Sequence, residues 1–146
     1  MKFSIGCDHG GYEYKEQVIK YLKDKGHEVV DCGTYSLDSC NYPEFAIKTA
    51  EKVKNGEVDR GIVICRSGEG VSIAANKVKG VRCGIGYNTT VARLMREHND
   101  ANMIAFGADY FTIQEVEAML DEFIKAEFAK GKHEIRVNMI KDYENK

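Results

Sequence analysis

Two patterns of apolar and polar residues alternate along this chain. Short runs rich in β-branched residues are typical of strands that are buried on both faces, as in a parallel sheet. Between these runs, apolar residues recur every three or four positions, which is typical of amphipathic helices. The predicted strands cover residues 2–7, 27–31, 61–65, 81–87 and 102–106. The predicted helices cover 12–25, 43–54, 71–78, 88–98 and 112–128.

This alternation of strands and helices predicts an α/β fold. We expect a doubly wound, Rossmann-like, five-stranded parallel sheet with helices on both faces. The chain has 146 residues, which suits a single domain. Residues 129–146 show no apolar face of their own and are interpreted as a tail. The loops that follow the strands should meet at one edge, where we expect Asp8, His9, Tyr42, Cys65 to Gly70, Tyr87 and Gly107 to Asp109.

Composition and charge exclude several classes of protein. The chain is 43% hydrophobic and 30% charged, with a net charge of -2, which is typical of a globular protein and gives no basic signature for nucleic acid. No apolar run is long enough to cross a membrane, and the first strand follows Met1 too closely for a signal peptide. The five cysteines fit neither a zinc motif nor a disulfide framework. We therefore expect a cytoplasmic protein that binds neither nucleic acid nor membrane.

The most informative stretch runs from Gly61 to Gly70, where a buried strand leads into a glycine-rich turn and then a helix. Open α/β folds bind their ligands at such places. Cys65 ends the strand, and Ser67 and free backbone N–H groups follow it. The pattern predicts a base or nucleophile at Cys65 beside an anion-binding loop. The alternative is that Cys65 is only a small buried side chain.

Other phosphate and metal motifs do not fit the sequence. Gly68 and Gly70 are too close together for a P-loop, and the turn after the first strand lacks a dinucleotide fingerprint. Asp31, at the end of the second strand, stands where dinucleotide-binding folds have a ribose-binding acid, so a nucleotide cofactor remains an alternative. A cysteine-based phosphatase loop would need arginine at the position of Val71. No His and carboxylate cluster has metal-ligand spacing.

Several motifs occur together in a fixed order, and their combination resembles the type B ribose-5-phosphate isomerase family, which includes the galactose-6-phosphate isomerase subunits. The similarity covers essentially the whole chain. The motifs are Asp8-His9-Gly10-Gly11, Tyr42-Pro43, Cys65-x-Ser67-Gly68-x-Gly70-x-Ser72-Ile73-Ala74-Ala75-Asn76-Lys77, Arg96-x-His98-Asn99-x-Ala101-Asn102 and Gly131-x-His133-x-x-Arg136.

The resemblance implies an aldose–ketose isomerase of the pentose phosphate pathway that needs no metal or organic cofactor. Such an enzyme interconverts ribose 5-phosphate and ribulose 5-phosphate through a cis-enediolate. The resemblance also implies a homodimer or homotetramer whose sites lie at the subunit interface. In that arrangement, residues 129–146 would dock on the partner subunit.

The resemblance also implies catalytic roles for four residues. By position, Cys65 moves a proton between C1 and C2, and Ser67, usually threonine in the family, handles the hydroxyl proton. Asp8 contacts the sugar, and His98 opens the furanose ring. Removal of a proton next to a carbonyl needs a base and donors aimed where negative charge develops, so these residue types suit the reaction.

A further group of residues is implied to bind the substrate. The backbone N–H groups of Gly68 and Gly70 would hold the enediolate oxygen. Contacts to the rest of the sugar and to its phosphate are implied for His9, Tyr42, Asn99, Lys132 and Arg136.

The chain departs from the family pattern at four positions. Arg66 stands where glycine is usual, Glu69 replaces a small or neutral residue, and Asp109 replaces an arginine that many members use for phosphate. Lys132 also replaces a usual arginine and loses its bidentate fork. We expect Arg66 to rebuild the phosphate site.

These departures leave two alternatives to a ribose-5-phosphate isomerase open. The first is an isomerase of another aldose phosphate (allose, galactose or tetrose phosphate) or of a free sugar. The second is a non-catalytic subunit of a heteromeric isomerase.

Overall fold

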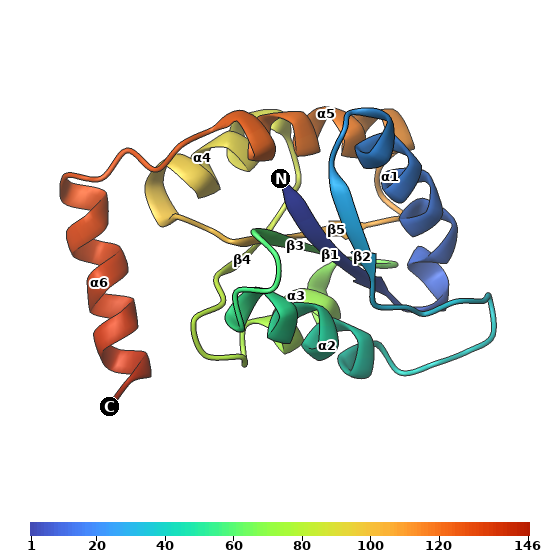
Figure 1. The fold of residues 1–146 in the computed structure, drawn as a ribbon, viewed down its shortest axis with the longest axis horizontal. Coiled ribbons are helices and arrows are strands. Elements are labelled where there is room, and N and C mark those ends of the chain that lie inside the picture. Colours follow the sequence, from blue (N-terminus) through green and yellow to red (C-terminus); the bar gives the residue numbers. More distant parts are fainter.

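The computed structural model describes residues 1–146 and has the α/β fold expected from the sequence. Five parallel strands form one sheet in the order β2-β1-β3-β5-β4. Figure 1 shows helices covering both faces of this sheet. The strands are β1 (Lys2–Cys7), β2 (Glu28–Asp31), β3 (Arg60–Cys65), β4 (Cys83–Ile85) and β5 (Met103–Gly107).

The helices begin where local start signals stand in the sequence. Pro43 lies in the first turn of α2, where its missing N–H costs nothing. The Asn88 side chain accepts the N–H of Val91 and caps α4, and Thr112 and Glu115 form a capping box at the start of α5. The helices are α1 (Tyr12–Asp24), α2 (Tyr42–Lys54), α3 (Glu69–Ala75), α4 (Thr89–Asn99), α5 (Ile113–Lys125) and α6 (Lys132–Glu144), with a 3₁₀ turn at His9–Gly11.

Alternate residues of the central strands enter two separate hydrophobic cores. On β3, Ile62 and Ile64 pack with residues of α1, α4 and α5, while Val63 and Cys65 pack with residues of α2 and α3. This alternation follows from the two-residue period of a strand. The cysteine that ends β3 therefore belongs to the face of the sheet that α2 and α3 cover.

Three predicted elements have a boundary that differs from the structure by two residues or more. The strand predicted at 81–87 is only Cys83–Ile85, because β4 lies at the edge of the sheet and pairs only with β5. Helix α3 begins at Glu69 rather than Val71 and ends at Ala75 rather than Val78, and α5 ends at Lys125 rather than Phe128. Helix α3 starts earlier because the first helical turn needs no apolar residue.

Residues 129–146 were interpreted as a tail, but most of them form α6. This helix stands apart from the sheet at the left of Figure 1 and packs on α4. Val137 is its only buried residue. Its other large apolar side chains, Ile135, Met139, Ile140 and Tyr143, are exposed. No helix of the chain combines the length and the apolar character that a membrane crossing requires.

A buried lysine joins α1 to the end of β2. The side chain of Lys15 is 0% exposed, and its Nζ lies 2.7 and 2.8 Å from the two carboxylate oxygens of Asp31 and 3.0 Å from Glu16. Burial acts to lower the pKa of Lys15, but hydrogen bonds to Asp31 and Glu16 outweigh it and raise the pKa above its ordinary value. Asp31 also accepts the N–H of Gly33, so the pair fixes the start of the loop after β2.

Replacement of Lys15 by methionine should destabilise the fold, because it leaves the Asp31 carboxylate without its charged partner. Asp31 is 32% exposed, so we expect a loss of about 1–3 kcal/mol, below the cost of breaking a fully buried pair. Urea unfolding measures the change. The matched control is Lys20→Met, which removes an exposed pair with Asp24 and should change stability by less than about 0.5 kcal/mol. Equal effects of the two substitutions would contradict this assignment.

Candidate functional site

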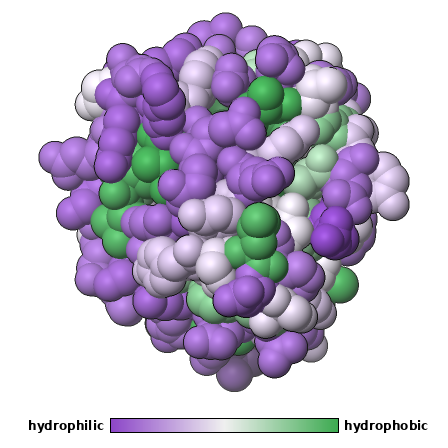
Figure 2. Space-filling model, turned by 90° about the vertical axis from the view of Figure 1, so that its right-hand side faces the viewer, coloured by the Kyte–Doolittle hydropathy of each residue, from purple (hydrophilic) through white to green (hydrophobic).

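The candidate site lies at the carboxyl edge of the sheet, between β1 and β3. The chain leaves β1 toward β2 and leaves β3 toward the other half of the sheet, so the two loops diverge. Open α/β folds bind their ligands in a crevice at such a switch point. The Asp8 N–H donates to the Ile64 carbonyl at 3.2 Å and ties the loops together at its base. Figure 2 looks onto this side of the molecule, which is mostly hydrophilic with small separate hydrophobic patches.

Cys65 ends β3 at the base of these diverging loops. It is 5% exposed, and its Sγ accepts a hydrogen bond from the Gly68 N–H at 3.2 Å. The turn that provides the donor needs φ of +83° at Gly68, a conformation that glycine adopts without strain. The arrangement therefore places the sulfur atom beside a backbone donor at the strand end, a position that suits a base or nucleophile.

Ser67 and Tyr42 lie beside Cys65. The Ser67 hydroxyl oxygen accepts the N–H of Glu69 at 3.2 Å, and its residue is exposed at the mouth of the crevice. Tyr42, in the first turn of α2, lays its ring against Gly70, where a Cβ atom would lie 2.7 Å from the ring. The Tyr42 ring thus forms one wall beside the loop that carries Cys65 and Ser67.

Asp8 and His9 enter the crevice from the loop after β1. Asp8 is nearly buried, and its Oδ1 accepts the N–H of Gly11 at 3.1 Å. His9 Nδ1 accepts the N–H of Cys40 at 3.3 Å, which assigns the proton of a neutral ring to Nε2. His9 can therefore donate from Nε2 to an anion. No three His, Cys, Asp or Glu side chains lie close enough together to hold a metal ion.

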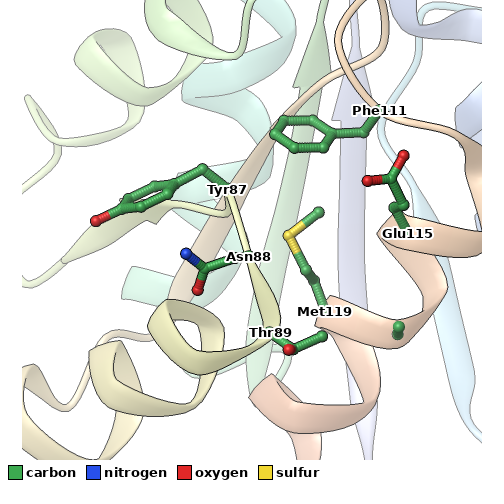
Figure 3. A pocket seen from close by; sticks show the side chains of 7 residues that line it. Tyr87, Asn88, Thr89, Phe111, Glu115 and Met119 are labelled. Atoms are coloured by element: carbon green, nitrogen blue, oxygen red, sulfur yellow. The ribbon is translucent and has the colours of Figure 1, made fainter.

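An aromatic hollow that the sequence analysis did not assign adjoins Ser67. It has a volume of about 570 Å³ and is lined by Ser67, Glu69, Ile85, Tyr87, Tyr110 and Phe111. A smaller cavity of about 240 Å³ shares Tyr87 and Phe111 with it. In that cavity the Met119 side chain extends toward the Phe111 ring (Figure 3). Tyr110 and Phe111 lie in the loop that follows β5, so a position after a strand is the sequence signal that could have indicated them.

Four residues that the sequence analysis placed in the site lie elsewhere in the same chain. Helix α4 starts at the carboxyl edge and spans roughly 16 Å, so His98 and Asn99 at its end lie near the amino edge. The His98 ring stacks on His133 with centroids 4.1 Å apart and planes 11° apart. Lys132 and Arg136 belong to the same α6 turns as His133, at the left of Figure 1. Each chain thus carries two groups of predicted site residues at opposite edges of its sheet.

Comparison with known proteins places the chain in one family. The sequence profile described as Ribose/Galactose Isomerase matches residues 3–140. The structure of ribose-5-phosphate isomerase B from Clostridium thermocellum is 48% identical, with a TM-score of 0.98, over 99% of this chain and 98% of the other.

Two further relatives carry information on ligands. The structure of ribose-5-phosphate isomerase B from Mycoplasma genitalium with bound ribulose-5-phosphate is 39% identical, with a TM-score of 0.95, over 99% and 97% of the two chains. The galactose-6-phosphate isomerase subunit LacB of Clostridium acetobutylicum is 42% identical over 90% of this chain and 76% of its own length. The chain therefore belongs to the ribose/galactose isomerase family of sugar-phosphate isomerases.

Proposed function

We propose that this protein interconverts ribose 5-phosphate and ribulose 5-phosphate through a cis-enediolate. The observation that carries the proposal is the Cys65 thiol at the carboxyl end of β3, where its Sγ accepts the Gly68 N–H. Asp8 lies on the adjoining loop, and Tyr42 packs against the turn that carries Ser67. The similarity to ribose-5-phosphate isomerases B over the whole chain supports the choice of substrate.

In the proposed reaction, the Cys65 thiolate removes the proton from C2 of the open-chain aldose. The electron pair of the broken C–H bond forms the enediolate double bond, and negative charge develops on the C1 oxygen. The thiol then returns the proton to C1, while Ser67 moves the hydroxyl proton between the two oxygens. The Gly68 N–H already donates to the Cys65 sulfur, so in this proposal the Gly70 N–H is the donor that stabilises the developing oxyanion.

We further propose that each complete site is formed by two chains. His98 opens the sugar ring, with Asn99, Lys132 and Arg136 beside it, and none of these reaches the Cys65 crevice of its own chain. The exposed apolar side chains of α6 provide a surface for a second copy, and a two-fold dimer brings the amino edge of one chain to the carboxyl edge of the other. Isologous contact of this kind forms two equivalent sites.

A second candidate function is isomerisation of a longer aldose phosphate such as galactose 6-phosphate. The similarity to the LacB subunit favours it. The hollow of about 570 Å³ beside Ser67 also offers room for an additional carbon of the substrate. Comparison of kcat/KM for ribose 5-phosphate and galactose 6-phosphate with the purified chain decides between the two.

Replacement of Cys65 by serine should lower kcat by about 10²- to 10⁴-fold, because a serine hydroxyl is a much weaker base. The measurement is steady-state turnover of ribose 5-phosphate. Cys83→Ser is the matched control, since Cys83 lies on β4 outside the crevice. Near wild-type turnover of Cys65→Ser would mean that another residue is the base.

Alkylation by iodoacetamide near neutral pH should also abolish turnover, and substrate should protect the enzyme. Burial raises the pKa of Cys7 to about 12, and the pKa of Cys83 also to about 12, so these two thiols stay protonated and unreactive. Mass spectrometry should find the modification that accompanies inactivation on Cys65. Full activity of protein alkylated at Cys65 would contradict the proposed role.

A mixture of Cys65→Ala and His98→Ala chains should regain activity that neither variant has alone. In a randomly mixed dimer, half of the molecules are heterodimers with one intact site each, so roughly a quarter of the wild-type activity should return. Turnover after unfolding and refolding the mixture measures this. A fully active monomer in light scattering would exclude sites shared between chains.

A phosphate anion at the amino edge should raise the pKa of His133. Burial lowers this pKa from its ordinary value, and the positive charges of His98, Lys132 and Arg136 lower it further. A bound anion would offset that repulsion. NMR titration of the ring with and without inorganic phosphate measures the shift.

His27 is the matched control for this titration. Burial and the N-terminal amino group lower its pKa, and no site residue lies beside it, so phosphate should leave it unchanged. Equal shifts of both histidines would indicate a general effect of salt.

A further inference from the structure

Arg66 is an exposed arginine that lies on the loop of the proposed catalytic site. It stands between Cys65 and Ser67, and its side chain is 62% exposed. The other loops at this edge of the sheet, residues 8–11, 32–41, 86–88 and 108–112, contain no lysine or arginine. Lys15, the nearest lysine in the sequence to the first loop, is already bound to Asp31 and Glu16. Arg66 is thus the one guanidinium that these loops carry.

The stem of Arg66 lies flat on the loop that follows β1. A Cβ atom at Gly10 would lie 2.5 Å from Arg66 Cγ and 3.2 Å from its Nε, so only glycine leaves room for the side chain there. Gly10 follows His9 directly, so the Arg66 stem lies against the loop that carries His9.

Asp109 is the only carboxylate that pairs with this guanidinium. The backbone of the two residues is joined by the Asp109 N–H, which donates to the Arg66 carbonyl at 3.0 Å. The side chains meet only at 3.5 Å between Arg66 Nη1 and Asp109 Oδ1, and the Asp109 side chain is 47% exposed. Water weakens a pair with this exposure. One long contact also leaves most of the five guanidinium N–H donors available to a planar or tetrahedral oxyanion.

We propose that Arg66 binds the phosphate group of the substrate and exchanges the Asp109 carboxylate for phosphate oxygens. His9 donates to the same phosphate from Nε2, because Nδ1 already accepts the Cys40 N–H. In the empty site, Asp109 holds the guanidinium over Gly10 and competes with the incoming anion. The inference rests on the proposed function, since it assigns the phosphate end of that substrate.

The reach of the chain supports this arrangement. Cys65 and Arg66 are consecutive, so the thiol and the base of the arginine stem are separated by a single peptide unit. The stem then passes over Gly10 on the loop after β1. The reacting carbons and the phosphate lie at opposite ends of an open-chain sugar phosphate. The same loop thus carries Cys65 as a base for the reacting carbons and Arg66 as a cation for the phosphate, which fits such a ligand.

The test compares three variants with a matched control. Arg66→Gln removes the charge, Arg66→Lys keeps the charge but loses the fork, and Asp109→Asn releases the guanidinium. Arg93→Gln is the control, because Arg93 forms a comparable exposed pair with Glu97 on α4, at 2.8 Å. For each protein, KM and kcat are measured for ribose 5-phosphate, and the dissociation constant of inorganic phosphate is measured by calorimetry.

Arg66→Gln should raise both KM and the phosphate dissociation constant about tenfold, with kcat within about twofold of wild type. Arg66→Lys should give an intermediate effect, and Asp109→Asn should tighten phosphate binding severalfold. Arg93→Gln should leave all three quantities unchanged. Melting temperatures equal to that of the wild type would show that each variant is folded.

The two readouts separate this inference from the proposed function. If the protein isomerises ribose 5-phosphate but Arg66→Gln leaves KM and phosphate binding unchanged, the role of Arg66 is overturned and the isomerase proposal stands. If no ribose 5-phosphate turnover is found but phosphate binding depends on Arg66, the substrate is wrong and the anion site stands. Turnover of free ribose at the same rate as ribose 5-phosphate would also overturn the inference.

Discussion

The divergence of two adjacent parallel strands determines the rest of this structure. The connection after β1 leads to β2 on one side, and the connection after β3 leads to the other half of the sheet. Backbone groups at such a switch point have no neighbouring loop to cover them, so a crevice forms there in any sequence with this topology. The hydrogen bond from the Asp8 N–H to the Ile64 carbonyl closes its base and sets the distance between the two loops.

The same topology explains why one chain carries its candidate site in two parts. Each crossover helix returns the chain from the carboxyl edge to the amino edge of the parallel sheet, so the first and last residues of α4 cannot lie at the same edge. His98 is therefore separated from Cys65 by the length of the helix. A family with this fold can use both ends of α4 in one reaction only where another molecule supplies one of them.

Much of this arrangement could be predicted from the sequence, because it depends on local periodicity. The run at 61–65 is apolar throughout, and the run at 2–7 is interrupted only by Lys2 and Ser4. The carboxyl ends of parallel strands must meet, so the sequence places Asp8 and Cys65 at one edge. The limits of β4 were less accessible, because Gly84 and Gly86 weaken the strand and only one neighbour pairs with it. The hollow beside Ser67 depends on how Tyr110 and Phe111 pack, which no periodicity encodes.

The course of residues 129–146 could not be predicted for a different reason. The apolar residues of α6 are spread around the helix, so no single face appears in the sequence. Its formation depends on the intrinsic preferences of residues such as Lys132, Glu134 and Met139, while its docking depends on surfaces far away in the chain. The pattern that identifies an amphipathic helix is absent here although the helix exists.

A helix attached in this way is a separate unit of stability within the fold. Thirteen residues are too few to remain helical alone in water, and Val137 is the only residue of α6 that is buried. The free energy that opens α6 is therefore small compared with that of the sheet, and any surface that covers Ile135 or Met139 adds to it directly. Amide hydrogens of α6 should then exchange at a rate set by what binds to the helix, independently of the exchange of β3 or β5.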